Sequence, residues 1–350
     1  MSRKGNVIRG IIILLIVLLI GYGGFKGFMA IELAGVPSTD IWMEDDAYHP
    51  DTVPRLAMTP GEDYRILVLA DIQLESHPIK DRNALKAVRK MVEKTQPDFI
   101  MTAGDNTSWV FADIKTKQLI KVMESFGIPW GVTLGNHDAE GRADRIWHGN
   151  RYEDAEYSLF RSGPSNIHGV GNYGINLTNG NGEIVYSLIM MDSNVLRQYE
   201  EGEDYDFIYY DQIKWYEWMV RGVSEAEGRP VPSLAFFHIP LPEFNDAVEA
   251  WNSGKIDPAD GFGETREGVF CPPFNTGLFS VMKDLGSTTH IFNGHDHVNN
   301  LSVDWEGIRM TYVQKTGRAS YSDRDMLGGT LVTIADGTYD VKVEHIDLNR

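Results

Sequence analysis

Short apolar runs that stop at polar residues recur along the middle of the chain. Three such runs occupy residues 65–70, 99–103 and 130–134 and are rich in branched and aromatic side chains, which is typical of strands buried on both faces. Between them, apolar residues recur at helical spacing over 85–92 and 114–126. Strands and helices alternating in this way predict a layered α/β domain.

The second half of the chain is richer in strand patterns. A helix is predicted over 211–223, where Trp215, Trp218 and Met219 fall on one face and are assigned to the core. The predicted strands are short apolar or alternating segments, and they occupy 174–177, 184–192, 233–238, 289–293, 310–314, 329–334 and 338–346.

The N-terminus has the pattern of a targeting segment. Basic residues up to Arg9 precede an apolar run over 11–20 that continues to Lys26, and roughly sixteen residues separate these two charges. We assign residues 1–30 to a signal anchor, with a cleaved signal peptide as the alternative. Basic residues before the run place the N-terminus in the cytoplasm. The following domain is therefore predicted to be extracytoplasmic, anchored to the membrane or, after cleavage, secreted.

Composition narrows the partners of the chain. Residues 31–62 are rich in Pro, Asp and Gly without a sustained period, so they predict a stalk or linker before a domain over 63–350. The net charge of −18 argues against a nucleic-acid partner, because phosphate contacts need clustered Lys and Arg. A phosphorylated substrate would then need metal ions to attract it. The single cysteine, Cys271, excludes an intrachain disulfide, and the oligomeric state stays open.

Polar residues with metal-binding chemistry follow five of the predicted strands. Strand ends in layered α/β folds are where ligands bind, because the loops there converge on rigid supports. Carboxylates, amides and imidazoles together suit Mn, Fe or Zn. The residues are Asp71 with Gln73, Asp105 with Asn106, Asn136 with His137, His238, and His295 with His297.

As a set, these motifs resemble those of the calcineurin-like metallophosphoesterases, which run D-x-H, G-D, G-N-H-D/E, a lone H and G-H-x-H. The resemblance covers about residues 64–320, and segments 135–141 and 263–277 are also similar to a purple-acid-phosphatase-like branch. It implies a four-layer α-β-β-α sandwich of two mixed sheets flanked by helices. The motifs here read Asp71-Ile72-Gln73, Gly104-Asp105-Asn106, Gly135-Asn136-His137-Asp138, His238 and Gly294-His295-Asp296-His297.

The resemblance also implies a role for each residue. Two divalent or trivalent metal ions would lower the pKa of a bridging water, and the resulting hydroxide would hydrolyse a phosphoester, with a monoester favoured over a diester. His137 would assist the leaving group, and Asp138 would orient His137. Among the metal ligands, Asp71 and His297 would bind the first ion, Asp105 would bridge both, and Asn136, His238 and His295 would bind the second.

Gln73 departs from the pattern, which has His at this position. The chain is then an active enzyme with a modified first site, an active enzyme in which Gln73 only hydrogen-bonds a metal-bound water, or a weakly active or inactive binder of one metal or a phosphate ligand. His77 is either a replacement ligand or a surface residue. Loop residues that could reach the substrate are Asn106, Arg142, Glu264 and Arg266, together with Glu140, His148 and Asn275.

Overall fold

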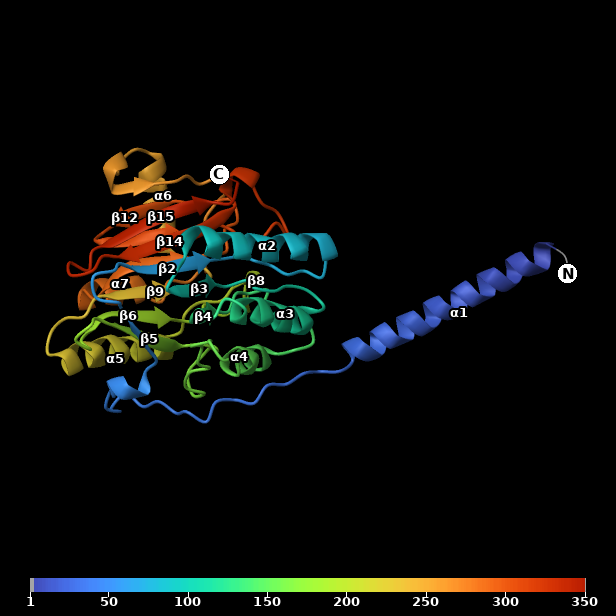
Figure 1. Cartoon of the computed structure of the whole chain (residues 1–350), viewed down its shortest axis with the longest axis horizontal. Coiled ribbons are helices and arrows are strands. Elements are labelled where there is room, and N and C mark those ends of the chain that lie inside the picture. The colour runs from blue at the N-terminus through green and yellow to red at the C-terminus, as the bar shows by residue number, and fades with distance from the viewer. Residues whose placement is uncertain (1–2, 350) are drawn as a thin grey trace.

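Two mixed β-sheets packed face to face form the centre of the computed structural model, which describes residues 3–349, with side chains from residue 11 onward (Figure 1). The larger sheet has, in spatial order, β1 (Arg55–Ala57), β5 (Tyr173–Thr178), β6 (Ile184–Met190), β9 (Ser233–Phe236), β11 (Thr288–Asn293), β13 (Ile308–Tyr312), β12 (Ser302–Trp305) and β10 (Gly261–Phe262). The smaller sheet has β15 (Val341–Asp347), β14 (Gly328–Ile334), β2 (Tyr64–Leu69), β3 (Phe99–Ala103) and β4 (Trp130–Thr133).

Helices cover the outer faces of both sheets. On the larger sheet lie α5 (Tyr210–Glu227), α6 (Glu243–Asn252) and α7 (Leu278–Leu285), and on the smaller one α2 (Pro78–Thr95) and α3 (Ala112–Glu124), with α4 (Arg145–Glu153) against α3. A separate hairpin pairs β7 (Leu196–Tyr199) with β8 (Gly202–Tyr205). Three short helical turns are η1 (Pro50–Thr52), η2 (Pro258–Asp260) and η3 (Arg324–Met326). The predicted four-layer α/β fold is confirmed.

The larger sheet is buried on both faces by alternating side chains. In β6 and the residue after it, Leu188 and Met190 belong to the core between the sheets, whereas Ile189 and Met191 belong to the core beneath α5 and α7. Successive side chains of a strand point to opposite faces, so a continuous apolar run fills two cores at once. A strand that contributes to both cores needs apolar residues at successive positions, which is why its sequence is a continuous apolar run.

The ten predicted strands are present, with small differences at their ends. The largest difference is in the last strand, which begins at Val341 because residues 336–338 form a turn. The unpredicted strands are β1, β7, β8, β10 and β12, each of two to four residues. Segments this short carry too little periodicity to be recognised.

The segment over residues 31–62 contacts the domain along its length (Figure 1). Its strand β1 pairs in parallel with β5, and Trp42 and Met58 are buried. Leu33 forms an isolated bridge with Ala143. Contacts between distant positions order these residues, which have no secondary-structure period of their own.

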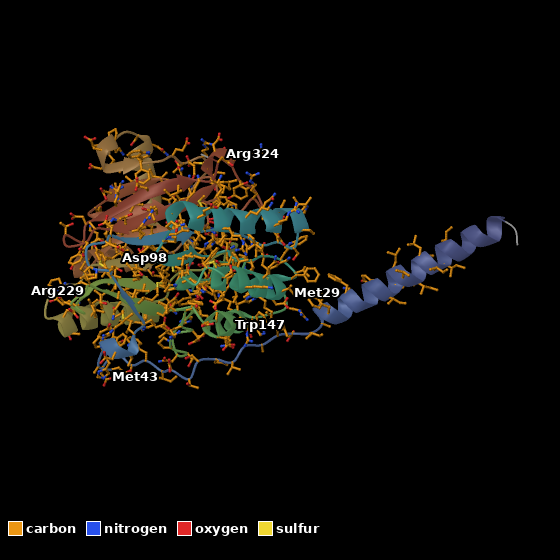
Figure 2. All side chains as sticks on the ribbon, in the orientation of Figure 1. Met29, Met43, Asp98, Trp147, Arg229 and Arg324 are labelled. Carbon is orange, nitrogen blue, oxygen red and sulfur yellow. The ribbon has the colours of Figure 1, made fainter. Side chains whose placement is uncertain are left out.

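Helix α1 (Arg3–Met29) projects away from the domain into open space (Figures 1 and 2). Its segment Ile11–Met29 is long and apolar enough to cross a membrane, and no other helix in the described part of the chain is. None of this segment is buried inside the structure. Its last turn packs on the domain, where the Phe28 ring lies 5.3 Å from that of Phe111. The helix is compatible with a signal anchor.

Candidate metal centre

The polar residues expected at the strand ends lie at one edge of the sandwich. β2, β3 and β4 run parallel, as do β9 and β11, so within each sheet the loops that follow these strands emerge on the same side. Asp71 and Asp105 follow β2 and β3, and His238 follows β9. The loop after β11 carries His295 and His297.

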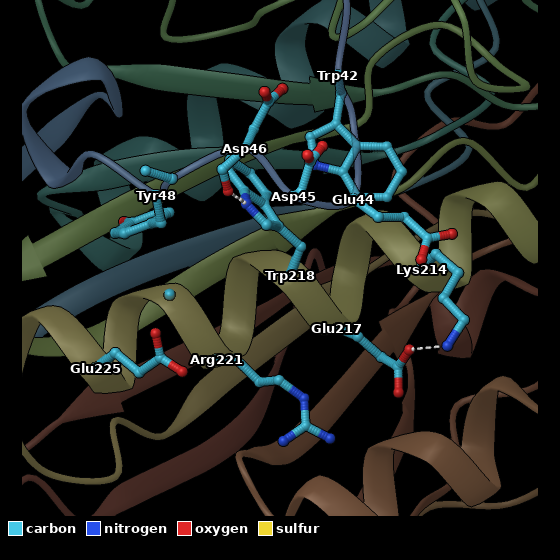
Figure 3. Close-up of a pocket in the computed structure, with 12 residues that line it drawn as sticks. Trp42, Glu44, Asp45, Asp46, Tyr48, Lys214, Glu217, Trp218, Arg221 and Glu225 are labelled. Atoms are coloured by element: carbon cyan, nitrogen blue, oxygen red, sulfur yellow. Dashed lines mark hydrogen bonds and ion pairs between the residues drawn. The ribbon is translucent and has the colours of Figure 1, made fainter.

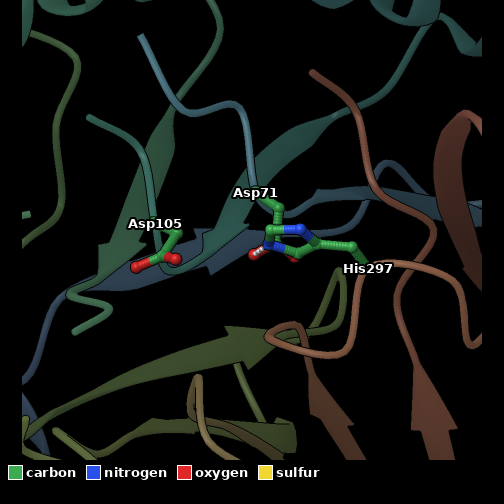
Figure 4. Close-up of side chains that lie close together, drawn as sticks. All are labelled: Asp71, Asp105 and His297. Atoms are coloured by element: carbon green, nitrogen blue, oxygen red, sulfur yellow. Dashed lines mark ion pairs between the residues drawn. The ribbon is translucent and has the colours of Figure 1, made fainter. Parts of the chain in front are cut away.

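One group of ligand atoms comes from Asp71, Asp105 and His297 (Figure 4). The carboxylate oxygens and the imidazole nitrogen of these buried residues lie within 4.8 Å of one another. His297 Nε2 is 3.3 Å from Asp71 Oδ1. Two carboxylates and an imidazole this close together, away from water, form a site suited to a metal cation.

A second group shares Asp105 with the first. His238 Nε2 lies 3.3 Å from Asp105 Oδ1 and 3.3 Å from His295 Nδ1. Two ligand atoms about 2.1 Å from one tetrahedral ion are separated by roughly 3.4 Å, so this spacing fits an ion between them. His238 Nδ1 is 2.9 Å from the carbonyl oxygen of Ala103, which orients the ring with Nε2 toward the site.

Several buried atoms at this edge have no hydrogen-bond partner within the described part of the chain. They include Asn136 Oδ1, His295 Nε2 and His297 Nδ1. Buried polar atoms without partners are uncommon in proteins and indicate a ligand or water. The mixed oxygen and nitrogen donors fit divalent or trivalent ions such as Mn, Fe or Zn.

The backbone at the centre is held in an uncommon conformation. Asp71, Gln73, Asp105 and His295 have φ angles of 52°, 44°, 50° and 78°, in the left-handed region that residues with a Cβ rarely adopt. Such strain is retained where the surrounding structure requires it, and it clusters at functional sites. A Cβ at Gly135 would lie 2.2 Å from Asp105 Oδ1, so this position of the motif must be glycine.

Charges at the centre favour binding of cations. Burial alone would raise the pKa of Asp71 and Asp105, but the ion pairs with His297 and His238 outweigh it and hold the pKa of both carboxyls below the usual range. Burial, reinforced by the neighbouring His238, lowers the pKa of His295 to about 3. His295 is therefore neutral, as a metal ligand must be.

Gln73 is held by a lysine that was not among the residues predicted for the site. Its Nε2 donates to Asp105 Oδ2 at 3.2 Å, while its Oε1 accepts from Lys315 Nζ at 2.7 Å. Lys315 is 2% exposed and also donates to the carbonyl oxygen of Asp71 at 3.2 Å. Burial lowers the Lys315 pKa to about 8, although the carboxylates of Asp71 and Asp105 favour its charged form. The amide oxygen that could bind a metal is thus occupied by an ammonium group. The sequence offered one indication of this role, because Lys315 directly follows the predicted strand 310–314, as the predicted ligands follow their own strands.

His137 is oriented by Glu140. The Nδ1 atom of His137 lies 2.5 Å from Glu140 Oε1, and its backbone N–H donates to Asp105 Oδ1 at 2.9 Å. Burial alone would lower the pKa of His137, but the bond to Glu140 and the charge of Asp105 outweigh it and raise the pKa to about 9. The imidazole is therefore protonated at neutral pH.

Asp138, which the sequence analysis assigned to orient His137, has a different environment. Its buried carboxylate accepts from the backbone N–H groups of Gly135 and Thr107, each at 2.8 Å, and from Asn106 Nδ2 at 3.1 Å. The prediction that Asp138 orients His137 is therefore corrected. Asp138 instead accepts hydrogen bonds from backbone N–H groups that have no partner in a strand or helix, and these bonds connect the loops after β3 and β4.

The four residues predicted to contact substrate are engaged elsewhere. Asn106 is fully buried against Asp138, and Arg142 pairs with Asp113 at 2.9 Å. Arg266 forms ion pairs with Glu264 and Asp323 at the surface. These side chains are therefore held by partners other than the metal ligands.

Of the other predicted candidates, Glu140 contacts His137 and His77 lines the cleft described below, whereas His148 and Asn275 are engaged elsewhere. His77 caps α2 by accepting from the Lys80 backbone N–H at 3.3 Å. His148 is buried against the Thr116 hydroxyl at 2.8 Å. Asn275 donates to Glu243 at 2.7 Å.

A cleft of about 490 Å³ adjoins the centre. Its lining includes Gln73 and His137, which both donate hydrogen bonds to Asp105, together with Trp109, Glu75 and Glu140. A separate hollow of about 340 Å³ lies between residues 42–48 and α5, bordered by Trp42, Trp218 and several carboxylates (Figure 3). Because the second hollow contains none of the predicted ligands, the cleft beside His137 is the candidate substrate site.

Comparison with known proteins identifies relatives with phosphatase names. The chain is 28% identical over 264 residues to "Probable inactive purple acid phosphatase 28" of Arabidopsis thaliana, covering 69% of this chain and 64% of that protein. It is 30% identical over 272 residues to "Phosphatase DCR2" of Saccharomyces cerevisiae, covering 70% of this chain and 46% of that protein. The chain therefore spans less than two thirds of the length of these relatives.

A solved structure and a family model complete the comparison. The crystal structure of a dimetal phosphatase from Danio rerio aligns with a TM-score of 0.49 at 12% identity, covering 82% of this chain and 99% of that one. Residues 64–299 match the family model "Calcineurin-like phosphoesterase". The resemblance stated from the motifs is confirmed, and the chain belongs to the calcineurin-like phosphoesterase family.

Proposed function

We propose that this protein hydrolyses a phosphoester, with a monoester favoured over a diester, in a metal-dependent reaction. The observation that carries the proposal is the convergence of Asp71, Asp105 and His297 with His238 and His295 at one buried edge beside a cleft. A structural role alone would not leave imidazole and amide atoms buried there without partners.

In this proposal the chain holds two ions in adjoining sites. Asp71 and His297 would bind one ion, Asp105 would be shared, and Asn136, His238 and His295 would bind the other. Ions bound there would neutralise charge on the phosphoryl oxygens and acidify a water molecule. The buried strand ends fix the ligands, so little rearrangement accompanies the reaction.

His137 acts as the proton donor to the leaving oxygen. Its Nδ1 is engaged by Glu140, so Nε2 is the atom left to donate into the cleft. The raised pKa of about 9 keeps the proton on the ring until the leaving oxygen develops negative charge. Glu140 holds the ring orientation and favours the charged form.

The Gln73–Lys315 pair makes a second function a serious alternative. An ammonium next to the first site repels a cation, so a chain that binds one ion and a phosphate ligand without turnover is also consistent with the structure. Of the three interpretations of Gln73, the contacts favour those in which its amide oxygen does not bind the metal.

We also propose that residues 1–30 anchor the protein, with the catalytic domain outside the cytoplasm. The exposed apolar helix supports anchoring, and the basic residues before it support the orientation.

The test uses the full-length chain in detergent, loaded with Mn, Fe or Zn and assayed with aryl phosphate monoesters and diesters. We expect release of the aryl alcohol that depends on added metal and falls by at least about a hundredfold in His137→Ala. Metal analysis accompanies the assay. Bound metal with no turnover of any ester would favour the binding protein, and no uptake of transition metal would contradict both functions.

A further inference from the structure

The loops that build the metal centre also hold the base of α1. The loop after β3 carries Asp105 and then Phe111, whose ring lies 5.3 Å from Phe28. The loop after β4 carries His137 and then Arg142, whose guanidinium lies 3.4 Å from the centre of the Phe28 ring. Five or six residues span at most about 20 Å, so the backbone of Phe111 and of Arg142, whose side chains contact the end of the helix, lies within that distance of Asp105 and His137.

The attachment of α1 is specific. Arg142 donates to the carbonyl oxygen of Phe28 at 3.3 Å and pairs with the buried Asp113 at 2.9 Å. Leu33 donates to the Arg142 carbonyl oxygen at 2.9 Å and accepts from the Asp144 backbone N–H at 3.1 Å. Cation–π and ion-pair contacts that are partly desolvated are the stronger ones, so these bonds orient the domain relative to the helix.

The catalytic edge faces the side from which α1 leaves. Figure 2 labels Asp98, which precedes β3, and Arg229, which precedes β9, on the side of the domain away from Met29. The two strands therefore run toward the base of α1. Asp105 and His238 follow these strands in the sequence.

Exposed apolar side chains lie in the cleft wall and in the first turns of the helices that follow it, since Pro78, the first residue of α2, also lines the cleft. Trp109 is 66% exposed, lines the cleft with His137, and has a φ of 71°, which is rare for a bulky residue. Ile79 and Ile114, in the first turns of α2 and α3, are 58% and 46% exposed. Tryptophan and large aliphatic side chains beside a membrane helix are typical of surfaces in contact with the bilayer interface.

Carboxylates in the cleft are paired and so are less repulsive to a phosphate group. Glu75 pairs with Lys80 at 2.6 Å, and Glu140 pairs with His137. Their charges are offset by neighbouring cations. The cleft thus combines an exposed indole with paired carboxylates, and it adjoins the cation-binding groups.

We infer that the cleft faces the bilayer from which α1 emerges and takes a lipid phosphomonoester from it, an inference that rests on the proposed function. The phosphate reaches the metal centre while the acyl chains stay in the bilayer, next to Trp109 and the two isoleucines. Water adds its oxygen to phosphorus, the bond from phosphorus to the lipid oxygen breaks, and that oxygen takes a proton. The products are inorganic phosphate and the neutral lipid alcohol.

The activity test compares two esters of the same glycerol oxygen. Metal-loaded full-length protein is reconstituted in phosphatidylcholine vesicles and given either phosphatidic acid in the same vesicles or glycerol 3-phosphate in solution. We expect the ratio of phosphate release from phosphatidic acid to that from glycerol 3-phosphate to exceed ten. The ratio should fall at least about tenfold in the double variant Ile79→Glu/Ile114→Glu, because contact with the bilayer would then transfer two carboxylates from water into an apolar environment.

Ile41→Glu is the matched control, because Ile41 is 59% exposed and belongs to the segment near Met43, on the side away from Met29 (Figure 2). It should leave the ratio unchanged. A wild-type ratio of one or less, or equal ratios in the double variant and the wild type, would overturn the inference.

A binding measurement separates this inference from the proposed function. Brominated phosphatidylcholine should quench the fluorescence of the wild type more than that of Trp109→Phe, since the indole at position 109 contacts the lipid. Equal quenching of the wild type and Trp109→Phe, together with hydrolysis of glycerol 3-phosphate, would refute the inference that the cleft faces the membrane. It would leave the proposed function standing. Stronger quenching of the wild type, with hydrolysis of neither ester and of none of the aryl phosphates, would refute the proposed function and leave the membrane contact supported.

Discussion

Replacing Lys315 by Met should tighten binding of the more weakly held metal ion. The ammonium lies 2.7 Å from Gln73 Oε1, and the other end of that amide lies 3.2 Å from Asp105 Oδ2, the ligand shared by both sites. At roughly 5–8 Å and an effective dielectric constant of about 20, a unit charge repels a divalent ion by about 4–7 kcal/mol. Neighbouring carboxylates screen part of this repulsion. We therefore expect a gain of at least about tenfold in affinity, or 1.4 kcal/mol.

Isothermal titration of metal-stripped protein with Mn or Zn measures this change for each ion. Lys283→Met is the matched control, because Lys283 pairs with Glu306 at the surface and should have no effect. Adding Gln73→His to Lys315→Met should tighten the same ion further, since imidazole is the better donor. Circular dichroism verifies that each variant is folded, and Lys315→Gln provides a second neutral side chain. Unchanged or weaker affinity in both folded Lys315 variants would show that the lysine orders the loops without opposing the metal.

Three further changes test the site and its support. Glu140→Gln should lower the apparent pKa of His137 from about 9 and reduce kcat by about tenfold or more, as measured by a pH–rate profile; a profile identical to that of the wild type would contradict the assigned role. Asp138→Ala should lower the free energy of unfolding by about 3–6 kcal/mol in urea, because it leaves two buried backbone N–H groups unpaired and removes one of the two hydrogen bonds of the Asn106 amide; a loss below about 1 kcal/mol would be inconsistent with these bonds. For His148, burial lowers the pKa to about 4, below the usual 6.5, so the unfolded chain takes up its proton first and stability falls as the pH drops from 6.5 to 4. His148→Gln should remove about 2 kcal/mol of the stability lost between pH 7 and pH 4.5, which urea titrations at these two pH values would detect; the same loss in the variant and in the wild type would exclude His148 as its source.

Residue roles were harder to predict than residue positions. The motif after β4 placed Asn136, His137 and Asp138 at a strand end, and they lie there. The motif did not show which neighbour holds His137, because Asp138 and Glu140 are both acidic and close in sequence. The backbone geometry selects Glu140, since Asp138 is drawn to the N–H groups of Gly135 and Thr107.

The sequence by itself determined the order and type of the main elements, the apolar N-terminal helix and the polar residues after each strand. These features depend on local periodicity and on side chains a few positions apart, which can be recognised along the chain without folding it. Only the tertiary structure decided that Lys315 contacts Gln73, 242 positions away, and that Arg142 contacts the end of α1. Such contacts form when distant loops close on one another, and no local pattern encodes which polar groups then meet.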